Sequence, residues 1–253
     1  MSGTKLFDSG NHKVFLFEEL TPASAVQANQ FLLIHNNEAM LLDPGGHKVQ
    51  SKLFADMSVL IPPKQVKYVF LSHQDPDIVA SINYWLMTTQ AQALISKLWI
   101  RFLPHFGLDS KLEGRVVPIE DGGRKLKLGD DCELLIIPAH FIHSPGNFQV
   151  YDPCSKILFS GDLGASLGQD YVFVEDFDSH IRYMEGFHRR YMASGKVLKL
   201  WANMVRNLDI EIIAPQHGAV FRGRDLVNRF IDWVSQLECG VDLLSEKDYT
   251  LPV

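Results

Sequence analysis

Histidine and aspartate side chains recur in four short segments, each of which follows a predicted β-strand or lies between two. A dense apolar run that stops at turn residues marks each of these strands. Loops at strand ends can aim several polar side chains at one point, so these segments constrain the fold strongly. They are residues 72–77 (SHQDPD), 140–143 (HFIH), 161–162 (GD) and 216–218 (QHG).

The whole chain has two similar halves, and in each half strands come first and helices follow. In the first half, strands are predicted over 13–17, 31–35, 39–42, 66–71 and 93–95, with helices over 49–60, 77–87 and 98–106. In the second half, strands are predicted over 126–128, 132–137, 146–151, 157–160 and 210–214, with helices over 177–192, 196–207 and 225–237. This order predicts an α/β protein with two mixed β-sheets flanked by helices, and residues 1–253 are expected to form a single domain.

The polar segments together offer three imidazoles and three carboxylates, an inventory that suits two metal ions. Two ions held a few ångströms apart need a carboxylate between them to bridge them and to screen their repulsion. The candidate ligands are His73, Asp75, Asp77, His143, Asp162 and His217.

The order of these ligands resembles that of the metallo-β-lactamase superfamily, which implies an αββα sandwich fold. Asp75 stands where the hydrolases of that superfamily place a second histidine, and a carboxylate there is similar to the flavodiiron branch. The stretches SHQDPDI, HSPGNFQVYDP, ILFSGDLGAS and PQHGA resemble the stand-alone oxygen-binding diiron proteins of that branch. The resemblance covers roughly residues 10–240 and implies two iron ions as cofactors.

The resemblance also implies how the ligands are shared. It gives the first iron His73, Asp75 and His143, and it gives the second iron Asp77 and His217, with Asp162 bridging the two. This chain departs from the family at two positions. Asp75 is one methylene shorter than the usual glutamate, so its carboxylate reaches less far. Ile78 replaces a further histidine of many relatives, so the second iron is expected to have an open position in a drier pocket.

Some of these aspartate and histidine residues also have simpler explanations that involve no metal. Asp75-Pro76-Asp77 before an apolar stretch is also good helix-capping chemistry. His140 and His143 are alternative candidates for the same metal ligand. His143 is favoured by its spacing to Asp162 and by the Ser-Pro that follows it. His140 is then expected to contact a ligand and orient it, without binding the metal itself. The remaining histidines fall in no motif, or on a predicted helix as surface or packing residues: His12, His35, His47, His105, His180 and His188.

Composition excludes some classes of function. The net charge of −6 does not favour nucleic acid, which needs an excess of Lys and Arg. The apolar runs are short and broken by charge, and the N-terminus shows no secretion signal, so no membrane span or export is expected. Three cysteines without a C-x-x-C pair predict reduced thiols and a cytoplasmic location: Cys132, Cys154 and Cys239.

Three functions follow as hypotheses. The first is a non-haem diiron protein that binds O₂ or NO and reduces it with electrons from an external donor, since no flavin-binding segment is seen before Val253. The second is a diiron O₂ sensor coupled to a signalling protein, as the resemblance to chemotaxis-associated relatives implies. The third is a binuclear zinc hydrolase, which rests on fold analogy alone. Whether the protein is an enzyme stays open, and the resemblance suggests a homodimer.

Overall fold

The computed structural model describes residues 3–22 and 24–252, and two β-sheets form its centre. The first sheet has seven strands in the order in which they occur in the chain. These are β1 (Thr4–Asp8), β2 (His12–Phe17), β3 (Gln30–His35), β4 (Glu38–Leu42), β5 (Val66–Phe70), β6 (Gln92–Ser96) and β7 (Val116–Ile119). Its first four strands are antiparallel and β4 to β7 are parallel, so the sheet is mixed.

The second sheet has six strands in the order β13-β12-β11-β10-β9-β8, and its single parallel pair is β11 with β12. The strands are β8 (Arg124–Leu128), β9 (Cys132–Pro138), β10 (Phe148–Asp152), β11 (Ile157–Gly161), β12 (Ile212–Pro215) and β13 (Phe221–Arg222).

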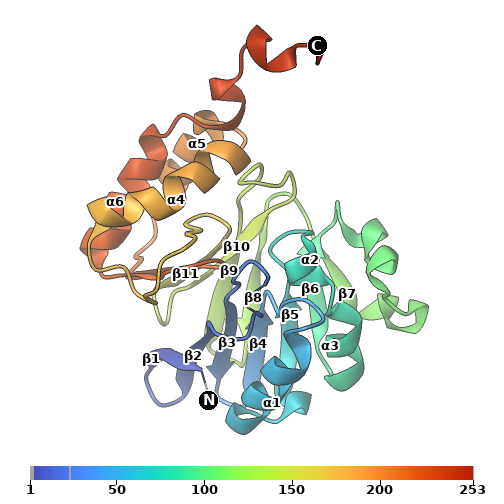
Figure 1. Ribbon diagram of the computed structural model, residues 1–253. Coiled ribbons are helices and arrows are strands. Elements are labelled where there is room, and N and C mark those ends of the chain that lie inside the picture. Colours follow the sequence, from blue (N-terminus) through green and yellow to red (C-terminus); the bar gives the residue numbers. More distant parts are fainter. Residues whose placement is uncertain (1–2, 23, 253) are drawn as a thin grey trace.

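Helices cover the outer face of each sheet, so the layers run helix, sheet, sheet, helix (Figure 1). Helices α1 (Gln50–Leu60), α2 (Pro76–Val79) and α3 (Ile82–Thr88) pack on the first sheet, and α4 (Phe177–Tyr191), α5 (Gly195–Val205) and α6 (Arg224–Gln236) on the second. Short 3₁₀ helices complete the elements: η1 (Pro63–Gln65), η2 (Ile100–Phe106), η3 (Ser110–Arg115), η4 (Gly240–Leu243) and η5 (Glu246–Tyr249).

The central strands are apolar on both faces because both faces are covered. Successive side chains of a strand point to opposite sides, so Leu33 and Met40 fill the space between the sheets. Leu32 and Leu41 face the helical layer instead. Across the core between the sheets, the rings of Phe31 and Phe159 pack edge to face, with their centroids 5.1 Å apart. The expected αββα sandwich of two mixed sheets is therefore confirmed.

The structure differs from the sequence-based prediction at three kinds of place. The helix expected over 77–87 is two helices, because Ser81 leaves helical geometry and its hydroxyl donates to the carbonyl of Gly45. The segment expected as a helix over 98–106 is the 3₁₀ helix η2, which has Pro104 inside it. Three strands were not predicted, β1, β7 and β13, which are short and lie at sheet edges.

Candidate metal centre

The sheet topology brings the four polar segments to one end of the sandwich. His73 follows β5 and His217 follows β12, and each strand ends at the same edge of its sheet as its parallel neighbour. His143 lies in the connection between β9 and β10, and β10 runs antiparallel to β11, so this connection reaches the same edge as Gly161. A backbone hydrogen bond from Phe148 to Ser72, 3.0 Å long, joins the two sheets at this edge.

Three of the predicted ligands form one group. The Nε2 atoms of His73 and His143 lie 3.6 Å and 3.5 Å from the same oxygen, Oδ2 of Asp75. The two imidazoles are in edge contact, with ring centroids 4.9 Å apart. Asp75 occupies the N-cap position of α2, but its side chain makes no capping hydrogen bond. Its carboxylate points to the two histidines instead, so capping does not account for this residue.

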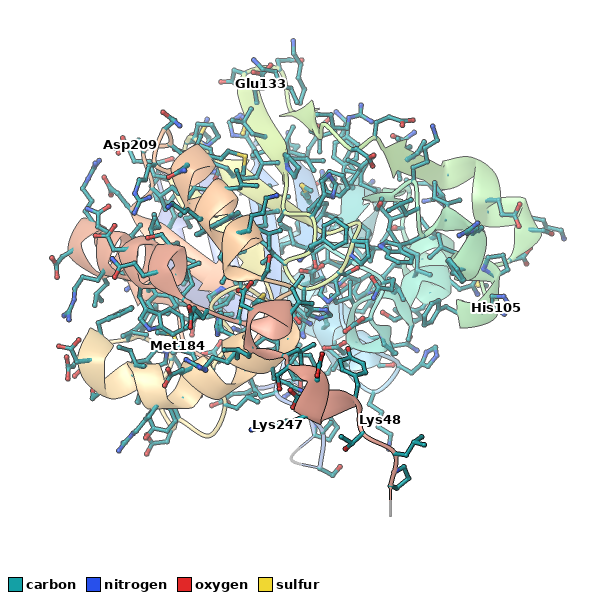
Figure 2. All side chains as sticks on the ribbon, turned by 90° about the horizontal axis from the view of Figure 1, so that it is seen from above. Lys48, His105, Glu133, Met184, Asp209 and Lys247 are labelled. Carbon is teal, nitrogen blue, oxygen red and sulfur yellow. The ribbon has the colours of Figure 1, made fainter. Side chains whose placement is uncertain are left out.

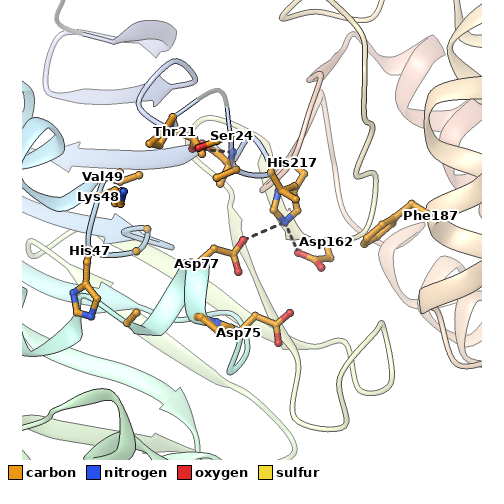
Figure 3. A pocket seen from close by; sticks show the side chains of 18 of the residues that line it. Thr21, Ser24, His47, Lys48, Val49, Asp75, Asp77, Asp162, Phe187 and His217 are labelled. Atoms are coloured by element: carbon orange, nitrogen blue, oxygen red, sulfur yellow. Dashed lines mark hydrogen bonds and ion pairs between the residues drawn. The ribbon is translucent and has the colours of Figure 1, made fainter.

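Two further predicted ligands form a second group (Figure 3). Nε2 of His217 lies 3.4 Å from Oδ2 of Asp77, which follows Pro76 at the start of α2. Gln216 donates to the same carboxylate oxygen through its side-chain amide at 3.1 Å, which fixes the direction of Asp77.

Asp162 lies between the two groups and turns one carboxylate oxygen to each. Its Oδ2 is 2.8 Å from Nε2 of His143 and 3.7 Å from Nε2 of His73, whereas its Oδ1 is 3.5 Å from Nε2 of His217. The side chain is 4% exposed. The structure thus brings all six predicted side chains together around one buried carboxylate, in the two groups that the resemblance implied.

The donor atoms fit metal ions. Oδ1 of Asp162 and Nε2 of His73 are buried and have no hydrogen-bond partner among the described residues, although an unpaired buried polar atom costs about 1–3 kcal/mol. At His217, Nδ1 lies 2.6 Å from the backbone carbonyl of Gln27, so Nδ1 carries the proton and donates. The lone pair of Nε2 then faces the carboxylates of Asp77 and Asp162. A lone pair that faces carboxylates in this way needs a metal ion or a proton between the atoms.

Opposite charges also hold the group together when no metal is bound. Burial by itself raises the pKa of Asp162, but His73 and His143 outweigh it and hold this pKa at about 2. Burial lowers the pKa of His143, but Asp162 and Asp75 raise it to about 10. The pKa of Asp75 is lowered in the same way: hydrogen bonds from His143 and His73 outweigh its burial. Positive charge is therefore favoured at the imidazole of His143.

Several residues that position the ligands were missed by the sequence analysis. The Gln27 side chain accepts from the backbone N–H of Gly218 at 2.8 Å, so Gln27 holds the His217 segment at two points. Asn29 donates to the carbonyl of Gly218 at 2.9 Å. Asp43 accepts from the backbone N–H of Ser72 at 2.8 Å, and burial raises its pKa to about 6. The long separation of these partners in sequence left no local motif to find.

A cavity of about 740 Å³ opens onto the centre. Asp75, Asp77, His143, Asp162 and His217 all line it. Its other walls come from the segment between β2 and β3, from the residues after β4, and from α4, and they include Ala25, Val26, His47, Phe187 and Tyr191. Phe187 points toward the centre in Figure 3. The centre is therefore open to a small ligand through a largely apolar passage.

Two residues expected beside the ligands lie elsewhere. The ring of His140 packs against Phe148 with centroids 5.2 Å apart, and its Nε2 is 2.8 Å from the carbonyl of Asp121. Ile78 is fully buried in the core beneath the first sheet and does not line the cavity among the described residues. It follows Asp77 on a helix, and successive helical residues point about 100° apart, so the two cannot face the same side.

The structure also shows where the histidines outside the candidate centre lie. His180 and His188 are fully buried, so both are packing residues and neither lies on the helix surface. His105 lies exposed on η2 at the outer edge of the molecule (Figure 2). His12 and His35, which belonged to no motif, contact each other with Nδ1 atoms 3.1 Å apart.

Comparison with known proteins now gives the family. The model of the ODP family beta lactamase matches residues 26–218, which is most of the chain. The chain belongs to this family. A structure of the peroxy diiron species of the chemotaxis sensor ODP is 42% identical, with a TM-score of 0.85 over 95% of this chain and 97% of that chain. The apo state of the chemotaxis sensor ODP from T. denticola is 40% identical, with a TM-score of 0.86.

More distant relatives share the fold. The rubredoxin oxygen:oxidoreductase of Desulfovibrio gigas is 16% identical with a TM-score of 0.77, and this chain covers 61% of it. The anaerobic nitric oxide reductase flavorubredoxin of Salmonella typhi is 21% identical over 81% of this chain. The uncharacterized protein MJ0732 of Methanocaldococcus jannaschii is 25% identical over 79% of this chain. The chain spans about half the length of this last relative, 51%. The flavodiiron-like β-lactamase core implied by the sequence is thus confirmed.

Proposed function

We propose that this protein holds two iron ions at the centre and binds O₂ or NO there. His73, Asp75 and His143 would hold one ion, and Asp77 and His217 the other. Asp162 would bridge them. One observation carries the proposal: the two oxygens of Asp162 face two separate ligand groups, with 2.8 Å to His143 on one side and 3.5 Å to His217 on the other.

The donor chemistry favours iron. Two imidazoles and one carboxylate, as at His73, His143 and Asp75, are the ligand set of many non-haem ferrous sites. Ferrous ions held at the centre would bind a diatomic ligand and supply electrons to it. The likeness to the diiron chemotaxis sensor ODP supports iron as well, and the zinc hydrolase alternative has no support from these relatives.

The residues around the centre suit a small apolar ligand. The stacked rings of Phe187 and Tyr191, with centroids 4.7 Å apart, form one wall of the cavity. The ring of Tyr191 also lies near the imidazole of His143, with the two ring centroids 6.0 Å apart. This aromatic wall limits the water that reaches the ligand groups, and it leaves space beside Asp77 and His217 for a diatomic molecule.

A sensor role is the form of this function that the comparisons favour. The likeness to the chemotaxis sensor ODP extends over nearly the full length of both chains, whereas this chain matches only about three fifths of the oxygen reductase of Desulfovibrio gigas. We therefore propose a protein that reports O₂ or NO to a signalling partner. Reduction of the ligand by an external electron donor is the second candidate.

Partners and location belong to the same proposal. The proposed partners are an electron-transfer or signalling protein and a second copy of this chain. No helix among the described residues has both the length and the apolar character that a membrane crossing requires. Sedimentation of the iron-loaded protein at several concentrations would decide between monomer and homodimer.

Anaerobic loading with ferrous iron, followed by O₂ or by NO, tests the proposal. We expect a visible absorption band that saturates at one diatomic ligand per chain. The variant Asp162→Asn should lose the band. The matched control His140→Gln should keep it, because His140 contacts Asp121 and Phe148 rather than the centre. A colourless wild-type protein after exposure to both gases would defeat the proposal.

An oxygen electrode then separates sensor from reductase. With a flavin reductase and NADH as the electron donor, a sensor should take up a fixed amount of O₂ and stop. Sustained consumption that is lost in Asp162→Asn would favour the reductase instead.

A further inference from the structure

A second group of metal-binding side chains lies at the opposite end of the sandwich. His12 begins β2 and His35 ends β3, and Cys132 begins β9 while Asp152 ends β10. These strand ends are the ones that face away from the candidate diiron centre. Figure 2 shows Glu133, the neighbour of Cys132, across the molecule from Lys48, which lines the cavity at the centre.

The ligand atoms of this group are close together. One atom each from His12, Cys132, Asp152 and Cys154 lies within 4.8 Å of every other. The sulfurs of Cys132 and Cys154 are 3.9 Å apart, and Cys132 Sγ is 4.0 Å from Nδ1 of His12. His12, Cys132 and Asp152 are buried.

Nε2 of each histidine contacts a carboxylate, which orients the imidazole ring. Nε2 of His12 lies 2.7 Å from Asp152, and Nε2 of His35 lies 2.7 Å from Asp131. A carboxylate only accepts, so each Nε2 carries a proton and donates it. In the neutral tautomers, both Nδ1 atoms then carry lone pairs, and these face each other across 3.1 Å.

Two facing lone pairs repel unless a cation lies between them. A shared proton would satisfy the two histidines, but it would give no role to the two thiols beside them. A metal ion bound by the two Nδ1 atoms could also bind the thiols, because Cys132 Sγ lies 4.0 Å from Nδ1 of His12 and 3.9 Å from Cys154 Sγ. Histidine held by a carboxylate on its outer nitrogen is also the usual arrangement of a metal-bound imidazole.

We propose that Cys132, Cys154, His12 and His35 form a tetrahedral site for a thiolate-preferring divalent ion such as zinc. In such a site, bonds of about 2.3 Å to sulfur and about 2.0 Å to nitrogen place two sulfurs about 3.8 Å apart and two nitrogens about 3.3 Å apart. The structure has 3.9 Å between the sulfurs and 3.1 Å between the nitrogens. Asp152 and Asp131 are positioning residues that orient the imidazoles.

An ion can reach this site from solvent, because Cys154 is exposed and lines a surface cavity together with Ser155. Hydrogen bonds also hold the Asp152 carboxylate in the position from which it orients His12. It accepts from the backbone N–H of Cys154 at 3.0 Å and from the hydroxyl of Ser155. The site would tie β2 and β3 of the first sheet to β9 and β10 of the second.

Titration of the metal-free full-length protein with Co²⁺ under argon tests the proposal. Cobalt bound to thiolate gives a sulfur-to-metal charge-transfer band, whereas the candidate diiron centre has only nitrogen and oxygen donors and gives none. We expect a band that saturates at one equivalent and is displaced by Zn²⁺. Failure of the diiron proposal would leave this band in place, so the two failures are distinguishable.

Variants assign the ligands. Cys154→Ser, near the surface, should weaken the thiolate band by about half or more, because Cys132 is then the one thiolate ligand left, while Cys239→Ser, the third cysteine, should leave the band unchanged. His35→Gln should weaken Co²⁺ binding at least tenfold, and Asp152→Asn about 10–100-fold. Far-ultraviolet circular dichroism checks that each variant is folded. Cys154→Ser should fold like wild type, because Cys154 is exposed.

Three results would overturn the proposal. These are a wild-type protein without a thiolate band, a band of undiminished intensity in Cys154→Ser, and a disulfide between Cys132 and Cys154 in protein purified without air. An unchanged affinity in His35→Gln would remove His35 from the ligand set and refute the tetrahedral site.

Discussion

Replacement of Gly218 by alanine should damage the centre through the backbone, without touching a ligand. Gly218 directly follows His217 and has φ +79°, in the left-handed region. A Cβ there would lie 2.1 Å from the hydroxyl oxygen of Ser166 and 2.3 Å from its carbonyl oxygen. Ordinary contact between carbon and oxygen needs about 3.3 Å, so the His217 segment or Ser166 must move by about 1 Å.

Gly168 offers a matched control for this change. It has a similar φ of +84°, and a Cβ there would meet nothing within 4 Å. Both variants bear the left-handed cost of about 1–2 kcal/mol, but only Gly218→Ala adds an overpacking cost of about 1–3 kcal/mol. We therefore expect losses of about 2–5 kcal/mol for Gly218→Ala and about 1–2 kcal/mol for Gly168→Ala.

Urea unfolding of the metal-free proteins measures the free energies of unfolding, and elemental analysis after anaerobic loading measures the iron retained. Gly218→Ala should retain about one iron fewer than wild type, because His217 moves away from Asp77 and Asp162. Gly168→Ala should retain as much as wild type. Equal losses of stability in the two variants, with full iron in both, would show that contact with Ser166 does not hold the His217 segment in place.

Three further predictions concern single side chains. Gln27→Ala removes the acceptor for the N–H of Gly218, so iron affinity measured by competition with a chelator should fall about 10–100-fold; unchanged affinity would mean that the amide does not hold the His217 segment. His143→Gln should lose iron in the same assay while His140→Gln keeps it, and the reverse result would exchange their roles. Burial lowers the pKa of His188 to about 4, and its Nε2 accepts from the N–H of Gly164. Below the ordinary pKa of about 6.5, the unfolded chain binds a proton here and the folded one does not, so stability falls with acid down to about pH 4. Between pH 7 and pH 5 this loss is about 2 kcal/mol, and urea unfolding should show it reduced in His188→Gln.

Much of the fold could be predicted because its strands are buried on both faces. The stretches 31–34 (FLLI) and 69–71 (VFL) are apolar throughout, and short apolar runs bounded by turn residues indicate central strands. The edge strand β1 (TKLFD) mixes polar and apolar residues, β7 (VVPI) contains a proline, and β13 has only two residues, so none of the three gives that pattern. The break at Ser81 depends on a carbonyl 36 residues away, which no local pattern reports. That residues 1–253 form one domain stays a prediction.

The candidate centre could be predicted because its ligands follow strands whose ends meet at one edge. The residues behind the ligands could not, since Gln27 and His217 are 190 residues apart and share no motif. The second group of ligands was missed for the same reason. His12 and Asp152 are separated by 140 residues, and only the pairing of the strands brings them within 2.7 Å.

The proposed centre depends on one buried carboxylate, Asp162, that joins two metal positions. A crystal structure of the protein loaded anaerobically with ferrous iron, with anomalous data collected at the iron absorption edge, tests it most directly. We expect two anomalous peaks on either side of Asp162, one beside Nε2 of His73 and His143 and one beside Nε2 of His217. A single peak, or two peaks that Asp162 does not touch, would contradict it.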